Sequence, residues 1–146
     1  MTPTRATQLL SLPVRLHGIQ LGRPVDLLLD REEFRALGLD VRCGDDIHRF
    51  LPLPTAVVKD DEICIRSPLV MLEEDELGFY RARSFGLASL RGRTIEREGR
   101  QAGKLVDIVV SPDWSLSEIV VEAEGKEARI PFDASVRLTP ESRSAA

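Results

Sequence analysis

The sequence predicts a mainly β protein made of two similar halves. The main observation is an internal repeat, since residues 18–29 and 99–110 align without gaps on one pattern: Gly, three residues, Gly, a base, any residue, Val-Asp and three aliphatic residues. Short runs in which apolar and polar residues alternate, separated by Gly, Pro and Asp turns, are typical of half-buried strands. The repeat pairs Gly18 with Gly99, Gly22 with Gly103 and Asp26 with Asp107.

The first half is predicted over residues 9–68, after a disordered N-terminus at residues 1–8, which is polar and contains a proline. Leu12, Val14 and Leu16 alternate as in a strand. In the repeated strand 24–30, Val25 is expected on the same face as Leu27 and Leu29. Residues 31–37 favour one helical turn, and further strands are expected at 39–43, 47–53 and in a hairpin over 57–66.

The connector, residues 69–89, is expected to be a short helical or irregular bridge. Acidic residues at 73–76 precede Arg81 and Arg83, the order that a helix dipole favours, whereas Gly78 interrupts the segment. Its apolar side chains should hold it against the rest of the protein.

The second half, residues 90–138, repeats the pattern with strands expected at 93–96, 102–110, 119–121 and 128–132. It has no counterpart of the hairpin arm 62–66, so its sheet should have an open edge, which natural proteins cover or pair. The connector, the N-terminal residues 8–12 or another chain could provide the cover. The tail 139–146 is polar and is expected to be disordered.

These residues resemble the PRC-barrel family, named for the cytoplasmic part of the photosynthetic reaction centre H subunit and found also at the C-terminus of a ribosome maturation factor. The resemblance is carried by the Gly-base-Val-Asp motif, the Ile/Val strand about ten residues later and the apolar-Pro-apolar strand before a final Val, and the second half fits best. It implies two small antiparallel PRC-barrel-like β-barrels in tandem, packed together, that are used for protein contacts. It implies no catalytic residues. Neither specific role transfers, because the chain has neither the membrane anchor of the first relative nor the RNA-binding-like half of the second.

Asp26 and Asp107 could be imagined as an acid–base pair. The favoured interpretation is that each accepts backbone or Arg/Lys hydrogen bonds at the same place in a repeated fold. No catalytic residue is therefore predicted, and the protein is not expected to be an enzyme. A hydrolase or metal enzyme stays as a third hypothesis, which needs a pocket that gathers carboxylates, His or Cys.

No metal or cofactor is expected. His17, Cys43, His48 and Cys64 have suitable chemistry for zinc, but their spacing matches no paired-ligand pattern. The paired glycines match no phosphate-loop motif and are expected to allow turns with positive φ. Trp114, in a turn, is either an exposed interface anchor or a cap over the end of the barrel.

Charge argues against nucleic acid as a partner, because 20 basic residues are outnumbered by 24 acidic residues and nucleic-acid binding depends on neutralised phosphates. No apolar run approaches the roughly 20 residues of a membrane span, and two cysteines are compatible with a reducing compartment. The sequence predicts a cytoplasmic adaptor or scaffold that forms a homodimer or binds a protein partner. The alternative is an RNA- or ribosome-associated assembly factor, for which a basic stripe would be needed: Arg91, Arg93, Arg97, Arg100 and Lys104.

Overall fold

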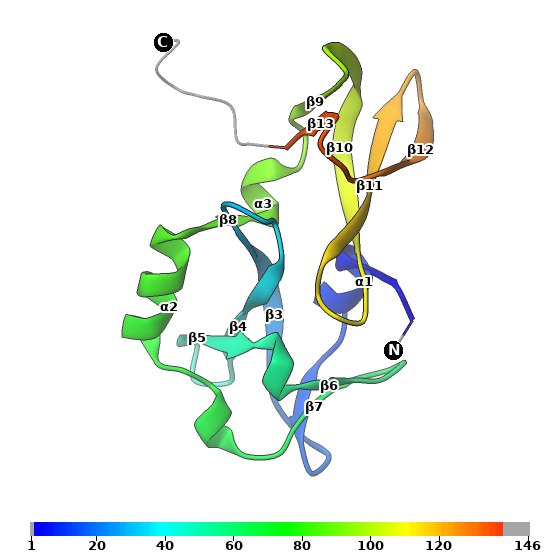
Figure 1. Ribbon diagram of the computed structural model, residues 1–146. Coiled ribbons are helices and arrows are strands. Elements are labelled where there is room, and N and C mark those ends of the chain that lie inside the picture. Colours follow the sequence, from blue (N-terminus) through cyan, green and yellow to red (C-terminus); the bar gives the residue numbers. More distant parts are fainter. Residues whose placement is uncertain (1, 139–146) are drawn as a thin grey trace.

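The structure, a computed structural model, describes residues 2–138; the tail expected to be disordered, 139–146, lies outside them. Figure 1 shows the arrangement of the helices and strands. The elements up to residue 65 are β1 (Thr4–Arg5), α1 (Ala6–Leu10), β2 (Val14–Leu16), β3 (Ile19–Asp30), β4 (Ala36–Cys43), β5 (His48–Pro52), a 3₁₀ turn (Leu53–Thr55), β6 (Val57–Val58) and β7 (Ile63–Ile65). The rest are a 3₁₀ turn (Pro68–Val70), α2 (Glu74–Ala82), β8 (Ser84–Gly86), α3 (Leu87–Leu90), β9 (Thr94–Arg97), β10 (Arg100–Val110), β11 (Leu116–Ala123), β12 (Lys126–Pro131) and β13 (Val136–Arg137).

The strands form two sheets, one for each half of the chain. The first sheet has the order β5-β4-β3-β2-β7-β6 and the second the order β12-β11-β10-β9-β13. Neighbouring strands are antiparallel except β2 and β7, which run parallel. Within residues 2–138 the end strands of neither sheet pair with each other, so the mainly β prediction is confirmed but neither half forms a closed barrel.

The two halves exchange short arms. The N-terminal arm, β1 with α1, precedes the first sheet but pairs with β10 of the second sheet, through Thr4 with Val110 and Arg5 with Val109. The connector arm, β8 with α3, precedes the second sheet but pairs with β3 of the first. Figure 1 shows the dark blue α1 beside the yellow β10 and the green α3 near the top of β3. Each half is therefore completed by a segment that belongs to the other in sequence.

The N-terminal arm corrects the expectation that residues 1–8 are disordered. Thr4–Arg5 is a strand and Ala6–Leu10 a helix, and the side chains of Ala6 and Leu9 are fully buried. Apolar burial and pairing with β10 order this polar-looking segment. In the second half, β9 is paired by the short strand β13 through Val136 and Arg97, and β13 is then the end strand of the sheet.

One continuous core joins the halves. Leu27 and Leu39 of the first sheet belong to the same buried cluster as Ile108 and Ile119 of the second, so the halves pack together as expected. A second, smaller cluster lies on the other face of the first sheet, where Leu77 of α2 packs on buried side chains of the sheet.

Each long central strand carries a bulge that the alternating pattern did not predict. The register of β3 against β4 skips Val25 and that of β10 against β11 skips Val106. An extra residue interrupts the alternation of faces, so Val25 is 45% exposed while Leu27 and Leu29 stay in the core. The prediction that Val25 shares their face was wrong.

Two loop predictions have different outcomes. The predicted helical turn is shorter than residues 31–37: a single turn at residues 31–33 is closed by the Phe34 N–H, which donates to the Asp30 carbonyl at 2.9 Å. β4 already begins at Ala36, whose N–H donates to the Trp114 carbonyl at 2.7 Å. The connector does contain a helix, α2, which lies over the first sheet and stacks Tyr80 on Phe50 with ring centroids 4.3 Å apart.

Candidate protein-contact surface

The two repeated carboxylates hold the exchanged arms. Asp107 Oδ1 accepts hydrogen bonds from the Thr7 N–H at 3.1 Å and the Ile108 N–H at 2.9 Å. Asp26 Oδ1 accepts from the Ala88 N–H at 3.0 Å and from the N–H of its own neighbour at 2.9 Å. Thr7 is the second residue of α1 and Ala88 is the second residue of α3, so each carboxylate binds the first turn of the helix that the other half supplies. The interpretation of both as hydrogen-bond acceptors agrees with these contacts.

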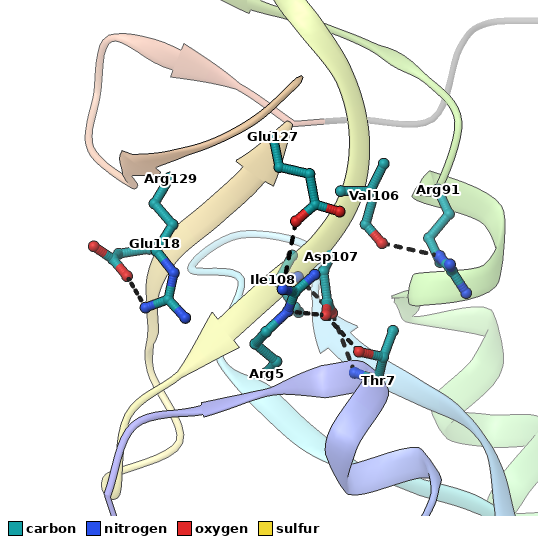
Figure 2. A network of polar contacts seen from close by, with 9 residues as sticks. All are labelled: Arg5, Thr7, Arg91, Val106, Asp107, Ile108, Glu118, Glu127 and Arg129. Carbon is teal, nitrogen blue, oxygen red and sulfur yellow. Dashed lines mark hydrogen bonds and ion pairs between the residues drawn. The ribbon is translucent and has the colours of Figure 1, made fainter. Parts of the chain in front are cut away.

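The two carboxylates differ in their side-chain partners. Asp107 is fully buried. Its second carboxylate oxygen, Oδ2, accepts hydrogen bonds from Arg5 Nε at 2.7 Å and from Thr7 Oγ1 at 2.5 Å (Figure 2). At the equivalent positions beside Asp26 stand Gly86 and Ala88, and a Cβ on Gly86 would collide with Asp26 Oδ2. The connector arm therefore supplies no guanidinium to Asp26. Burial raises the pKa of Asp26 above 3.8, opposed by the two N–H bonds and, more weakly, by the charge of Arg81.

The raised pKa of Asp26 predicts a pH dependence of stability. Since the folded state holds the Asp26 proton more tightly than the unfolded state, the contribution of Asp26 is most favourable below the unfolded value of 3.8 and is lost as the pH rises through the folded pKa. We expect the free energy of unfolding of the wild type, measured relative to Asp26→Asn by urea denaturation, to fall as the pH rises above 3.8. A difference in free energy between the two proteins that does not change with pH would contradict the raised pKa of Asp26.

The repeated glycines serve two purposes. Gly18 and Gly99 have φ of 82° and 79°, next to His17 and Glu98 at 50° and 55°, which is the pattern of the tightest hairpin turns and agrees with the expected positive φ. Gly22 and Gly103 also allow close contact between strands. Gly103 has a positive φ of 138°, but Gly22 does not, so the expected positive φ was wrong for Gly22. A Cβ on Gly22 would lie 2.5 Å from the Arg42 carbonyl oxygen, and one on Gly103 would lie 2.7 Å from the Glu122 carbonyl oxygen.

Trp114 lies in the turn between β10 and β11 with a φ of 68°. It is half-buried and packs against the main core, while its carbonyl binds the Ala36 N–H of the first half. This is the position of a cap between the halves. A role as an interface anchor stays a prediction.

A buried charge cluster was missed by the sequence analysis. Asp40, 3% exposed, lies opposite Asp26 across β3 and β4, accepts His48 Nδ1 at 2.8 Å and also binds the guanidinium of Arg81 from α2. An acidic residue inside an otherwise apolar strand was the available signal. Because Asp40 on β4 binds the guanidinium of Arg81 on α2, the cluster fixes α2 on the sheet.

The residues considered for zinc are not brought together. His48 binds Asp40, and Cys43 and Cys64 are free thiols. Among residues 2–138 no group of three or more His, Cys, Asp or Glu side chains could hold a metal ion.

Exposed apolar side chains lie beside two cavities at the end of the first sheet. Two cavities of about 490 Å³ each adjoin there and share Leu21, Cys43 and Gly44 as lining. Val25, 45% exposed, lines the first, and Leu69, 87% exposed in the 3₁₀ turn, lines the second. We call this surface the double cavity. Exposed apolar side chains beside a concavity are typical of protein-contact sites.

The charges around the double cavity are paired with one another. Arg49 donates to both oxygens of Asp45, at 3.1 and 2.9 Å, and Arg42 donates to Asp46 at 2.8 Å. The Arg49 hydrogen bond lowers the pKa of Asp45. The rim is therefore polar but carries no strong excess of either sign, so apolar contact is the main attraction that this surface offers.

The residues of the possible basic stripe lie just after α3 and in the β9–β10 hairpin. Arg91 donates through Nε to the Val106 carbonyl at 3.1 Å (Figure 2), and Arg93 to the Ser89 carbonyl at 3.4 Å. Arg97 lies directly opposite Arg100 in the β9–β10 hairpin, with Glu96 beside it.

Within residues 2–138 no helix is long and apolar enough to cross a membrane. No family model matches the chain, and a search of curated proteins finds no match.

Proposed function

We propose that this protein is a non-enzymatic, cytoplasmic adaptor or scaffold that acts through protein contacts, including self-association as a homodimer, and that its halves are PRC-barrel-like domains in tandem. The observation that carries the proposal is the double cavity, with Leu69 87% exposed at its edge. Burying a leucine side chain contributes about 2 kcal/mol, so a partner that covers Leu69 gains from apolar contact alone.

The chemistry of the buried groups supports the same proposal. Asp107 and Asp40 are saturated by hydrogen bonds from Arg5, Thr7, His48 and Arg81. None of these side chains lines the double cavity. The buried charges thus hold the arms and α2 in place, and the double cavity combines exposed apolar side chains with a polar rim.

Replacing Leu69 with glutamate tests the proposal. The stability of the fold should change by less than about 0.5 kcal/mol, because the side chain is exposed, while capture of partner proteins from a cell extract should be lost. Phe79→Glu is the matched control, since Phe79 is 51% exposed but lies on α2 and lines neither cavity.

Capture should be measured by affinity purification with quantitative mass spectrometry, and binding of the recovered partner by calorimetry. Equal capture by wild type and Leu69→Glu would exclude the double cavity as the contact site. Absence of any partner that binds the wild type directly would overturn the adaptor function at this surface.

A further inference from the structure

The second sheet ends in a strand whose outer edge has no partner among the described residues. β12, Lys126–Pro131, pairs with β11 on one side and is the end of the strand order. Figure 1 shows it as the outermost strand on the right. Exposed edges of this length are templates for pairing with another chain.

The other sheet ends within residues 2–138 are shorter or already bonded. β6 and β13 have two residues each. On β5, Phe50 exchanges two backbone hydrogen bonds with Leu72, at 2.9 and 2.8 Å. β12 is the long edge that this part of the chain leaves open.

The ladder determines which backbone groups of β12 face outward. The Phe132 N–H donates to the Ser117 carbonyl at 3.0 Å, and the register from there to Lys126 has no shift. Because antiparallel backbone groups alternate in direction, those of Ile130 and Ala128 face β11, and those of Glu127 and Arg129 face away. Pro131 also falls at an outward position, where its missing N–H removes no bond to β11.

The side chains along this edge are complementary to themselves. When two β12 strands pair antiparallel about a two-fold axis at Ala128, Glu127 of each copy lies opposite Arg129 of the other. These are the residues whose backbone groups face outward, so four backbone hydrogen bonds form together with the two charge pairs. Ala128 then lies directly opposite Ala128 of the second copy, where the two backbones are closest and a small side chain fits.

Within one chain Arg129 already donates to Glu118 at 3.2 Å, whereas Glu127 has no comparable partner in the described part of the chain. Glu127 lies directly opposite Glu122 on β11, and like charges in that relation repel. Its contact with Arg5 is long, 3.5 Å, and Glu127 is 51% exposed. The two-fold pairing places a guanidinium on the open side of Glu127.

We propose that two copies of this chain associate through β12, with Ala128 on the two-fold axis, to form one continuous sheet. The inference deepens the contact role proposed above by naming one partner, a second copy. It uses a different surface from the double cavity, so the two proposals fail separately.

The first test is cross-linking in a chain that carries Cys43→Ser and Cys64→Ser. Ala128→Cys should form a disulfide-linked dimer on mild oxidation, since Cα atoms in a directly opposed pair of this type are about 4.5 Å apart. Lys126→Cys is the matched control on the same strand. Two such thiols would lie about 14 Å apart along the paired strands, beyond the reach of a disulfide, and should cross-link far more slowly.

The second test is charge reversal, read by light scattering over a concentration series. The wild type should dimerise, Glu127→Arg should weaken the dimer about tenfold or more because both pairs become repulsive, and Glu127→Arg with Arg129→Glu should restore it. Leu69→Glu should leave the dimer unchanged. A wild type that is monomeric at every concentration, a dimer insensitive to Glu127→Arg, or equal cross-linking at residues 126 and 128 would overturn the proposal.

Discussion

Asp107→Ala is expected to lower the free energy of unfolding by about 3 kcal/mol, the cost of removing one partner from a buried charge network. The carboxylate is fully buried and accepts hydrogen bonds from Arg5, both donors of Thr7, and Ile108. Without it, buried N–H groups lose their partner and the N-terminal arm loses its charge contact. Thermal unfolding should show a decrease in Tm of about 10 °C for a chain of this size.

The matched control is Asp26→Ala at the equivalent position. Asp26 accepts hydrogen bonds from the backbone N–H groups of Leu27 and Ala88, and no side chain of the connector arm donates to it. Burial already disfavours the charged form of its carboxyl group. We expect a loss of about 1 kcal/mol. Equal losses of unfolding free energy for the two variants would show that the side chains of Arg5 and Thr7 do not stabilise the N-terminal arm.

Gly103→Ala is also expected to destabilise the protein by about 3 kcal/mol, since steric overlap and a strained backbone add together. Gly103 has a φ of 138°, and a Cβ would lie 2.7 Å from the backbone oxygen of Glu122. A backbone carbonyl in the centre of a sheet cannot move aside as a flexible side chain would. Urea denaturation would measure the loss.

Gly99→Ala, in the same hairpin, separates the two causes. Gly99 has a φ of 79° but no atom within 4 Å of an added Cβ, so only the cost of a left-handed backbone remains, about 1 kcal/mol. If both substitutions lower the free energy of unfolding equally, the close approach of β10 to β11 is not the reason for glycine at position 103.

Features that depend on neighbours in sequence were predictable. The hairpin turns at Gly18 and Gly99 follow from the conformational freedom of glycine, and their positive φ was expected. The repeated Asp was correctly interpreted as a hydrogen-bond acceptor because a strand carboxylate without nearby His, Ser or Cys has structural partners more often than catalytic ones. What that interpretation lacked was the identity of the partners.

Features that depend on distant segments were not predictable. The two arms share little sequence beyond Leu9 and Leu90, so nothing local shows that Thr4–Arg5 repeats the strand in Ser84–Gly86. The bulges at Val25 and Val106 arise from how β3 and β10 match their neighbouring strands. Ala36 begins a strand, and its N–H binds the Trp114 carbonyl, which is 78 residues away in the sequence.

The sequence by itself determined a mainly β chain, its division into two related halves and the turns that begin each repeat, because strand periodicity and glycine conformations are local properties. Tertiary structure alone decided that the halves exchange arms, that α2 covers Asp40 and that Leu69 and β12 remain exposed. The physical reason is that burial and pairing of these segments are set by contacts between residues far apart in the chain, whose free energies no short stretch of sequence contains.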